Sequence, residues 1–169
     1  RSLAAAIKSL VSEGSEVVAT SLTCYAVYEA ITGAKCQPVF ADVNLNTLHY
    51  DGRTLEKVLK THKNVKAIII QNNLGIPCDI ESIEKVAKEH NLIIIEDLAH
   101  CAGVRYKDGR EAGTIGAAAA LSFGKGKSID TICGGALVMR SDVKMPSAPL
   151  TVIRGGIILD KFFDDKFSA

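Results

Sequence analysis

The sequence predicts an α/β protein with three layers (αβα), in which a mostly parallel β-sheet lies between two layers of helices. Helical and strand patterns alternate along most of the chain, and two expected strands, KAIII (residues 66–70) and LIIIE (residues 92–96), are almost wholly apolar. Strands without polar alternation are buried on both faces, as in parallel sheets covered by helices on both sides. With 169 residues, the chain is long enough for one domain with a real core.

The expected elements follow from hydrophobic spacing and from capping residues. A first helix has four apolar side chains on one face, and Gly14 stands where its C-cap would: Leu3, Ile7, Leu10 and Val11. A second helix is expected over residues 25–32, closed by Gly33. Besides the two already given, strands are expected at residues 16–20, 38–42, 117–123 and 134–140.

Two more helices have clear start signals. Thr54 can cap a helix whose Leu55 and Leu59 point one way. Asp79 can cap another, which has charged residues on its outer face and four apolar side chains on its inner face: Ile80, Ile83, Val86 and Ala87.

Composition and charge exclude several classes of function. The chain has 20 Lys and Arg against 19 Asp and Glu, a net charge of +1, and no basic stripe that would bind nucleic acid. No apolar run could span a bilayer, and Lys8 interrupts the apolar start of the chain, which argues against a signal peptide. Five scattered cysteines without a CxxC pair predict reduced thiols in a cytoplasmic protein and no metal site: Cys24, Cys36, Cys78, Cys101 and Cys133.

Two segments carry chemistry. IIIEDLAH (residues 93–100) is an expected strand followed by Asp97 and His100, and LSFGKGKSI (residues 121–129) runs from a strand into a loop that contains Lys127. In open α/β sheets, ligands bind at the carboxyl ends of strands. An acid and an amine at neighbouring strand ends suit a pyridoxal phosphate (PLP) enzyme, where Lys forms the Schiff base and Asp keeps the pyridine nitrogen protonated.

These residues also have simpler interpretations. Asp97 alone could cap the next helix, and His100 alone could be structural. The GKS triplet at residues 126–128 matches the end of a phosphate-binding P-loop, but the glycine that this motif needs five positions earlier is Leu121. Nucleotide triphosphate binding is therefore disfavoured, and both Lys125 and Lys127 stay open as imine-forming lysines.

Five stretches in order resemble one family: EGSEVVATSLT, GAKCQPVFADVNLNTL, LGIPCDIESIEKVAKEHNLIIIEDLAH, GREAGTIGAAAALSF and KSIDTICGG. They are similar to the large domain of the DegT/StrS family, PLP-dependent sugar aminotransferases of fold type I. The resemblance implies a homodimeric aminotransferase that moves an amino group from an amino acid, with glutamate expected, to a nucleotide-linked keto-sugar. Such enzymes serve polysaccharide or secondary-metabolite sugar biosynthesis.

The resemblance also implies a role for each matching residue. Asp97 would pair with the pyridine nitrogen of PLP, His100 would lie near its phenolic oxygen, and Ser122 would bind its phosphate. Lys127, five residues after Ser122, would be the catalytic lysine that binds PLP covalently, whereas Lys125 does not align. Lys instead of His at position 127 favours amino transfer over dehydration.

The sequence departs from the family pattern at several positions. Cys24 stands where an aromatic residue usually stacks on PLP, with Tyr25 one position away. Ile132 and Cys133 replace a glycine and an acid, and the triplet QNN (residues 71–73) replaces a loop that contains His. These changes motivate an alternative, a non-catalytic or regulatory homologue that keeps the fold.

The resemblance also predicts how the chain is divided. We expect residues 1–145 to form the PLP-binding large domain without its N-terminal part, which in the family carries a phosphate-binding Ser-Gly-Thr. Residues 146–169 are expected to be a linker and the start of a truncated C-terminal region.

Overall fold

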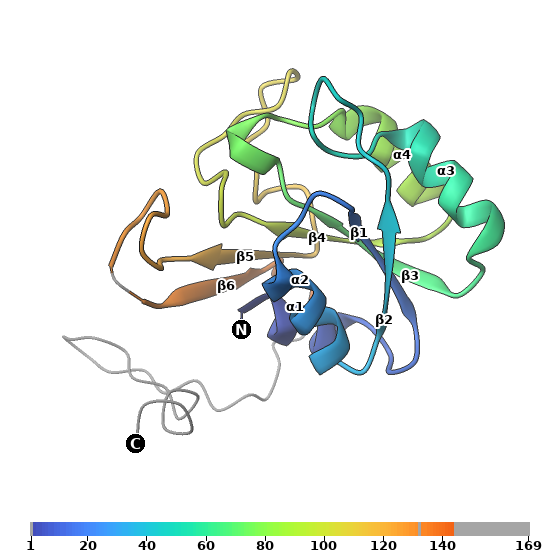
Figure 1. The fold of residues 1–169 in the computed structure, drawn as a ribbon, viewed down its shortest axis with the longest axis horizontal. Helices are drawn as coiled ribbons and strands as arrows, with labels where there is room; N and C mark the ends of the chain where they lie inside the picture. Colours follow the sequence, from blue (N-terminus) through green and yellow to red (C-terminus); the bar gives the residue numbers. More distant parts are fainter. Residues whose placement is uncertain (1, 132, 144–169) are drawn as a thin grey trace.

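A six-stranded sheet forms the centre of the computed structural model, which describes residues 2–131 and 133–143 (Figure 1). The strands are β1 (Glu16–Thr20), β2 (Gln37–Ala41), β3 (Val65–Ile70), β4 (Ile93–Asp97), β5 (Ala118–Ser122) and β6 (Gly135–Met139). Their order is β2-β1-β3-β4-β5-β6, and all neighbours are parallel except β5 and β6. The prediction of a mostly parallel sheet is confirmed.

Helices cover both faces of this sheet, which confirms the three layers. They are α1 (Ser2–Leu10), α2 (Tyr25–Gly33), α3 (Gly52–Thr61) and α4 (Ile80–Glu89), with a short 3-10 helix η1 (Asn73–Gly75). One apolar cluster joins α1 and α2 to side chains of β1, β3, β4 and β5, and a second joins α3 and α4 to the opposite face. Among the described residues, no helix combines the length and the apolar character needed to cross a membrane.

The predicted helices exist, but three of their ends differ from the prediction. Asp51, not Thr54, caps α3, because its Oδ1 accepts the Thr54 backbone N–H at 2.9 Å. Gly33 is the last residue of α2, and the left-handed residue that follows the helix is Lys35. Helix α1 ends at Leu10, so Gly14, with φ +81°, belongs to the turn that leads into β1. Asp79 caps α4 as predicted.

Strand β4 ends one residue later than predicted, so that Asp97 belongs to the strand and its face of the sheet is defined. Asp97 is the last residue of the strand, so Glu96 and Asp97 point to opposite faces of the sheet. Ile95 packs in the cluster with α1 and α2, and Asp97, two residues on, lies on that face. The predicted boundary at residues 145 and 146 and the expected linker lie outside the described residues.

Candidate active site

Three polar side chains lie on one face of the sheet at the carboxyl ends of adjacent strands. Gln71 follows β3, Asp97 ends β4 and Ser122 ends β5. The pairing of Ile70 with Glu96 places Gln71 level with Asp97. Each residue comes two positions after a member of the cluster on the side of α1 and α2: Ile69, Ile95 and Ala120. This edge of the sheet is where open α/β folds bind ligands.

Asp97 is a buried carboxylate that the protein satisfies incompletely. It is 9% exposed, and its Oδ1 accepts one hydrogen bond, from the Ala99 backbone N–H at 3.1 Å. Burial raises the pKa of Asp97, while the Ala99 N–H and the charges of Lys127 and His100 oppose this shift. Within the described part of the chain no hydrogen bond reaches Oδ2, so this oxygen can accept one from a ligand.

The structure brings Lys127 and His100 together, although they are 27 positions apart in the sequence. Lys127 Nζ lies 3.0 Å from His100 Nε2, within hydrogen-bond distance. Both side chains act electrostatically on Asp97. Lys127 is half-buried, whereas Lys125 is exposed. Of the two lysines that the sequence left open, the contact with His100 involves Lys127.

The loop after β5 sets the position of Lys127. Gly126 has φ +78°, a left-handed conformation that glycine adopts without strain, and its N–H donates to Asp130 Oδ2 at 2.8 Å. The Lys127 N–H then donates to the Gly124 carbonyl at 3.1 Å. The glycines that resembled a P-loop therefore turn the chain so that Lys127 faces His100.

Glu96 supports this edge from the other face of the sheet, a role that the sequence reasoning did not assign. It is 1% exposed. It accepts backbone N–H groups from Gly113 at 2.7 Å and from Ile115 and Gly116 at 2.8 Å, and the Tyr106 hydroxyl at 3.2 Å. These bonds fix the segment that leads into β5. The sequence contains one signal of this role, since Glu96 stands within an apolar strand and a charge buried there must be paired.

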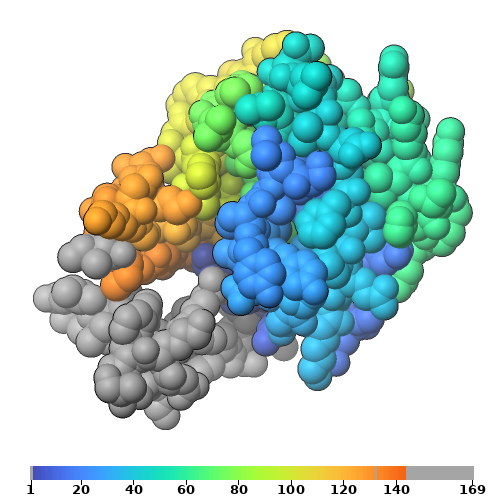
Figure 2. Space-filling model, viewed as in Figure 1, coloured from blue at the N-terminus to red at the C-terminus, as the bar shows by residue number. Residues whose placement is uncertain are grey.

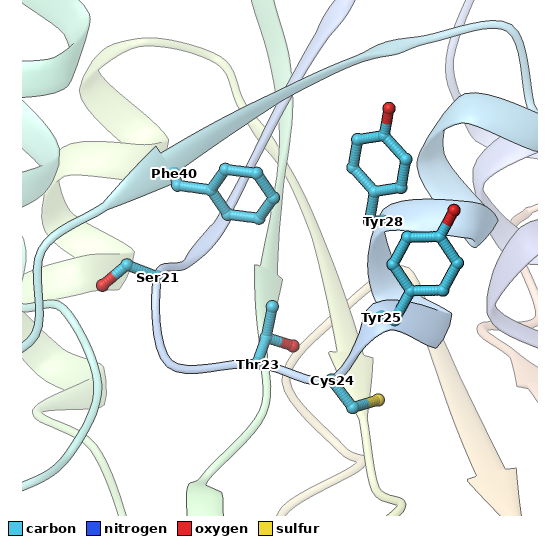
Figure 3. Close-up of a pocket in the computed structure, with 6 residues that line it drawn as sticks. All are labelled: Ser21, Thr23, Cys24, Tyr25, Tyr28 and Phe40. Atoms are coloured by element: carbon cyan, nitrogen blue, oxygen red, sulfur yellow. The ribbon is translucent and has the colours of Figure 1, made fainter.

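Cys24 and Tyr25 lie beside an open pocket of about 510 Å³ at the end of β1 (Figure 3). Cys24 is the N-cap of α2, and the ring of Tyr25 stacks on Tyr28 with centroids 5.4 Å apart. In Figure 3 the Cys24 side chain points away from Tyr28 and Phe40, whereas the Tyr25 ring lies beside Tyr28. The side chains of Tyr25 and Cys24 therefore point in different directions. Figure 2 shows α2 (blue) and β2 (cyan) adjacent at this surface.

The residues at this edge fit PLP. The cationic ring nitrogen of PLP needs a carboxylate, and Asp97 has an Oδ2 to which no described residue donates. Its aldehyde needs an amine, and Lys127 is half-buried within reach of the charge on Asp97. Gln71 Oε1 is buried without a hydrogen-bond partner in the described chain, as expected of a site that a polar ligand completes. The described residues contain no cluster of three or more metal-ligating side chains.

The three-layer αβα domain with its mostly parallel sheet has the fold of aminotransferases of known structure. The chain belongs to the DegT/DnrJ/EryC1/StrS aminotransferase family, whose profile matches residues 2–150. This confirms the family resemblance.

Named relatives agree with this membership. The chain is 38% identical over 128 residues to a GDP-perosamine synthase of Escherichia coli O157:H7, covering 76% of this chain and 34% of that protein. It is 33% identical over 132 residues to a pleiotropic regulatory protein of Geobacillus stearothermophilus, covering 78% and 35%. An aminotransferase of Psychrobacter cryohalolentis has a similar structure, with TM-score 0.77, 34% identity and coverage of 83% and 35%. The chain spans about a third of the length of these relatives.

Proposed function

We propose that this chain is part of a PLP-dependent aminotransferase that transfers an amino group from an amino acid to a nucleotide-linked keto-sugar. The observation that carries the proposal is the contact of Lys127 with His100 next to the buried, incompletely paired Asp97. Family membership and the GDP-perosamine synthase relative support the sugar substrate class. We further propose glutamate as donor, a homodimer, and a cytoplasmic location.

Each residue at the edge has a proposed task. Asp97 would bind the ring nitrogen through Oδ2, and its raised pKa would fall when it pairs with that cation. Ser122 would bind the phosphate, beside α1, whose Ser2 hydroxyl donates to the Leu121 carbonyl at 3.1 Å. His100 would lie near the phenolic oxygen. When bound, PLP supplies an electron sink that stabilises negative charge at the substrate carbon.

Lys127 would have two tasks. Its amine would hold the cofactor covalently in the resting enzyme, and, once an amino substrate has displaced it, would move a proton from the α-carbon of that substrate. The imidazole of His100, 3.0 Å from Nζ, would orient the free amine and accept its hydrogen bond. The same amine would return a proton during the transfer to the keto-sugar.

The experiment is borohydride reduction of the full-length protein after incubation with PLP, followed by mass spectrometry of the labelled peptide. We expect a visible absorbance band that reduction removes, and a pyridoxyl group on Lys127. Lys125→Ala is the matched control and should label as the wild type does. A protein that takes up no PLP, or a label on Lys125, contradicts the proposal.

A second candidate function is regulation without transamination. The relative from Geobacillus stearothermophilus, with 33% identity, is a pleiotropic regulatory protein, and Cys24 and Cys133 depart from the family pattern. A Lys127→Ala protein that keeps its full biological effect in cells would favour this candidate. Loss of that effect together with loss of PLP labelling would favour the aminotransferase.

A further inference from the structure

Gln71 has a buried side-chain oxygen that nothing in the described chain satisfies. The residue is 6% exposed, and its Oε1 accepts no hydrogen bond. Only two other buried side-chain polar atoms of the described residues share this state, the hydroxyls of Thr20 and Thr23. Because an unpaired buried amide lowers stability, a folded protein retains one mainly where a ligand or partner completes it.

The position of Gln71 identifies the ligand that would complete it. Gln71 is level with Asp97 on the adjacent strand, since Ile70 pairs with Glu96, and both side chains follow residues of the same apolar cluster. Thr20 differs, because Val18, two residues earlier, packs in the cluster on the opposite face with α3 and α4. Of the unpaired groups of Thr20 and Gln71, only that of Gln71 is on the face of Asp97.

The backbone around Gln71 is fixed before any ligand binds. The Gln71 N–H donates to His49 Nε2 at 3.3 Å, and the Tyr50 hydroxyl donates to the Ile69 carbonyl at 2.9 Å. On the other side, Asn72 donates to the Tyr106 hydroxyl and accepts the Cys78 N–H, both at 2.9 Å. A side chain on so constrained a backbone loses little freedom on binding, which is the arrangement of a prebuilt site.

We propose that Gln71 is an additional cofactor-positioning residue, whose amide donates a hydrogen bond to the phenolic oxygen of PLP. This inference rests on the proposed function. In that proposal the nitrogen of PLP pairs with Asp97, the phosphate with Ser122 and the aldehyde with Lys127, while the phenolic oxygen has only the exposed His100 near it. The side chain on the β3 side of Asp97 can supply a buried partner for this oxygen.

His100 does not make this role redundant. Its side chain is exposed and its Nε2 already contacts Lys127, whereas Gln71 is buried and unpaired. The nitrogen and oxygen of an amide exchange places by a rotation about the last side-chain bond. The NH₂ group can thus occupy the buried position and donate to the phenolate.

The test compares apo stability with cofactor affinity in the full-length protein. The variants are Gln71→Leu, its unbranched alternative Gln71→Met, and Thr20→Val as the matched control. Melting temperatures of the apo proteins and PLP dissociation constants from equilibrium dialysis are measured. We expect both Gln71 variants to bind PLP about tenfold more weakly, since one hydrogen bond to a charged oxygen is lost, and yet to melt at higher temperature as apo proteins.

Thr20→Val should also raise the apo melting temperature but leave the PLP dissociation constant unchanged. A structural role for Gln71 predicts the opposite pattern, a lower melting temperature with unchanged affinity. PLP affinity of the two Gln71 variants within twofold of the wild type would overturn this inference and leave the proposed function standing. Wild-type protein that binds no PLP would overturn both.

Discussion

Glu96 and Asp97 are adjacent carboxylates at the end of one strand, and the protein treats them in opposite ways. Glu96 is 1% exposed and receives four hydrogen bonds, three of them from backbone N–H groups. Asp97 is 9% exposed and receives one from the residues that the structure describes. A carboxylate that the fold satisfies completely stabilises structure, while one left with a free oxygen is available to a ligand.

The same contrast separates the two faces of the sheet edge. On the face of α3 and α4, Tyr106, Asn72 and Glu96 form a closed network. On the face of α1 and α2, Gln71 and Asp97 have oxygens that no described residue pairs, and the Lys127 amine contacts His100. We expect substitutions on the first face to change mainly folding stability and those on the second to change mainly cofactor binding and turnover.

The largest expected effect is that of Lys127→Ala. Aminotransferase turnover of the full-length protein should fall by roughly 10³-fold or more, since the proton-transfer group is lost, with little change in melting temperature because the side chain is half-buried in a loop. Steady-state kinetics with glutamate as donor measures this. Lys125→Ala should retain wild-type turnover, and a Lys127→Ala enzyme within tenfold of wild type would contradict the assignment.

Glu96→Gln should mainly destabilise the fold. The amide replaces one acceptor oxygen with NH₂, so that at least one backbone N–H among Gly113, Ile115 and Gly116 loses its partner. We expect the free energy of unfolding to fall by about 3 kcal/mol in urea titrations. Glu81→Gln, on the exposed face of α4, is the control and should change it by less than about 0.5 kcal/mol. If Glu96→Gln and Glu81→Gln lowered the free energy of unfolding equally, Glu96 would not have the structural role that distinguishes it from Asp97.

The burial of His49 predicts that folding stability depends on pH. It is fully buried, and burial lowers its pKa from 6.5 to about 4. The unfolded chain therefore binds more protons between these values, so stability should fall as pH decreases from 6.5 to 4, by on the order of 3 kcal/mol. Unfolding at a series of pH values tests this. His49→Gln should lose this part of the slope, and an unchanged slope in the variant would show that other groups cause it.

The smallest effect is expected from Asp97→Asn, with opposite signs for affinity and stability. PLP should bind roughly 10- to 100-fold more weakly, because one charge-assisted hydrogen bond is lost. Apo stability at pH 7 should rise, since burial raises the pKa of Asp97 and the folded state penalises its ionised form. For the same reason, this contribution of Asp97 falls as pH rises from 3.8 through its folded-state pKa. Equilibrium dialysis and apo melting curves measure both, and an apo melting temperature below that of the wild type would contradict this explanation.

Several features of the site could be predicted from the sequence. The apolar run before Asp97 predicted it at a strand end, the glycines around Lys127 predicted a loop after the next strand, and the family spacing selected Lys127 over Lys125. The contact of Lys127 with His100 agrees with that choice. The roles of Glu96 and Gln71 were not predicted, because their hydrogen-bond partners, or the lack of one, depend on segments far away in the sequence.

The sequence by itself determined the order of helices and strands, the three layers and the family, since hydrophobic periodicity and local capping depend on near neighbours in the chain. Only the tertiary structure decided which strand ends are adjacent, that Asp97 faces α1 and α2 while Glu96 faces the other way, and that Lys127 lies 3.0 Å from His100. The physical reason is register. A shift of one residue along β4 moves every side chain to the opposite face of the sheet, so Glu96 would take the place of Asp97 on the face of α1 and α2.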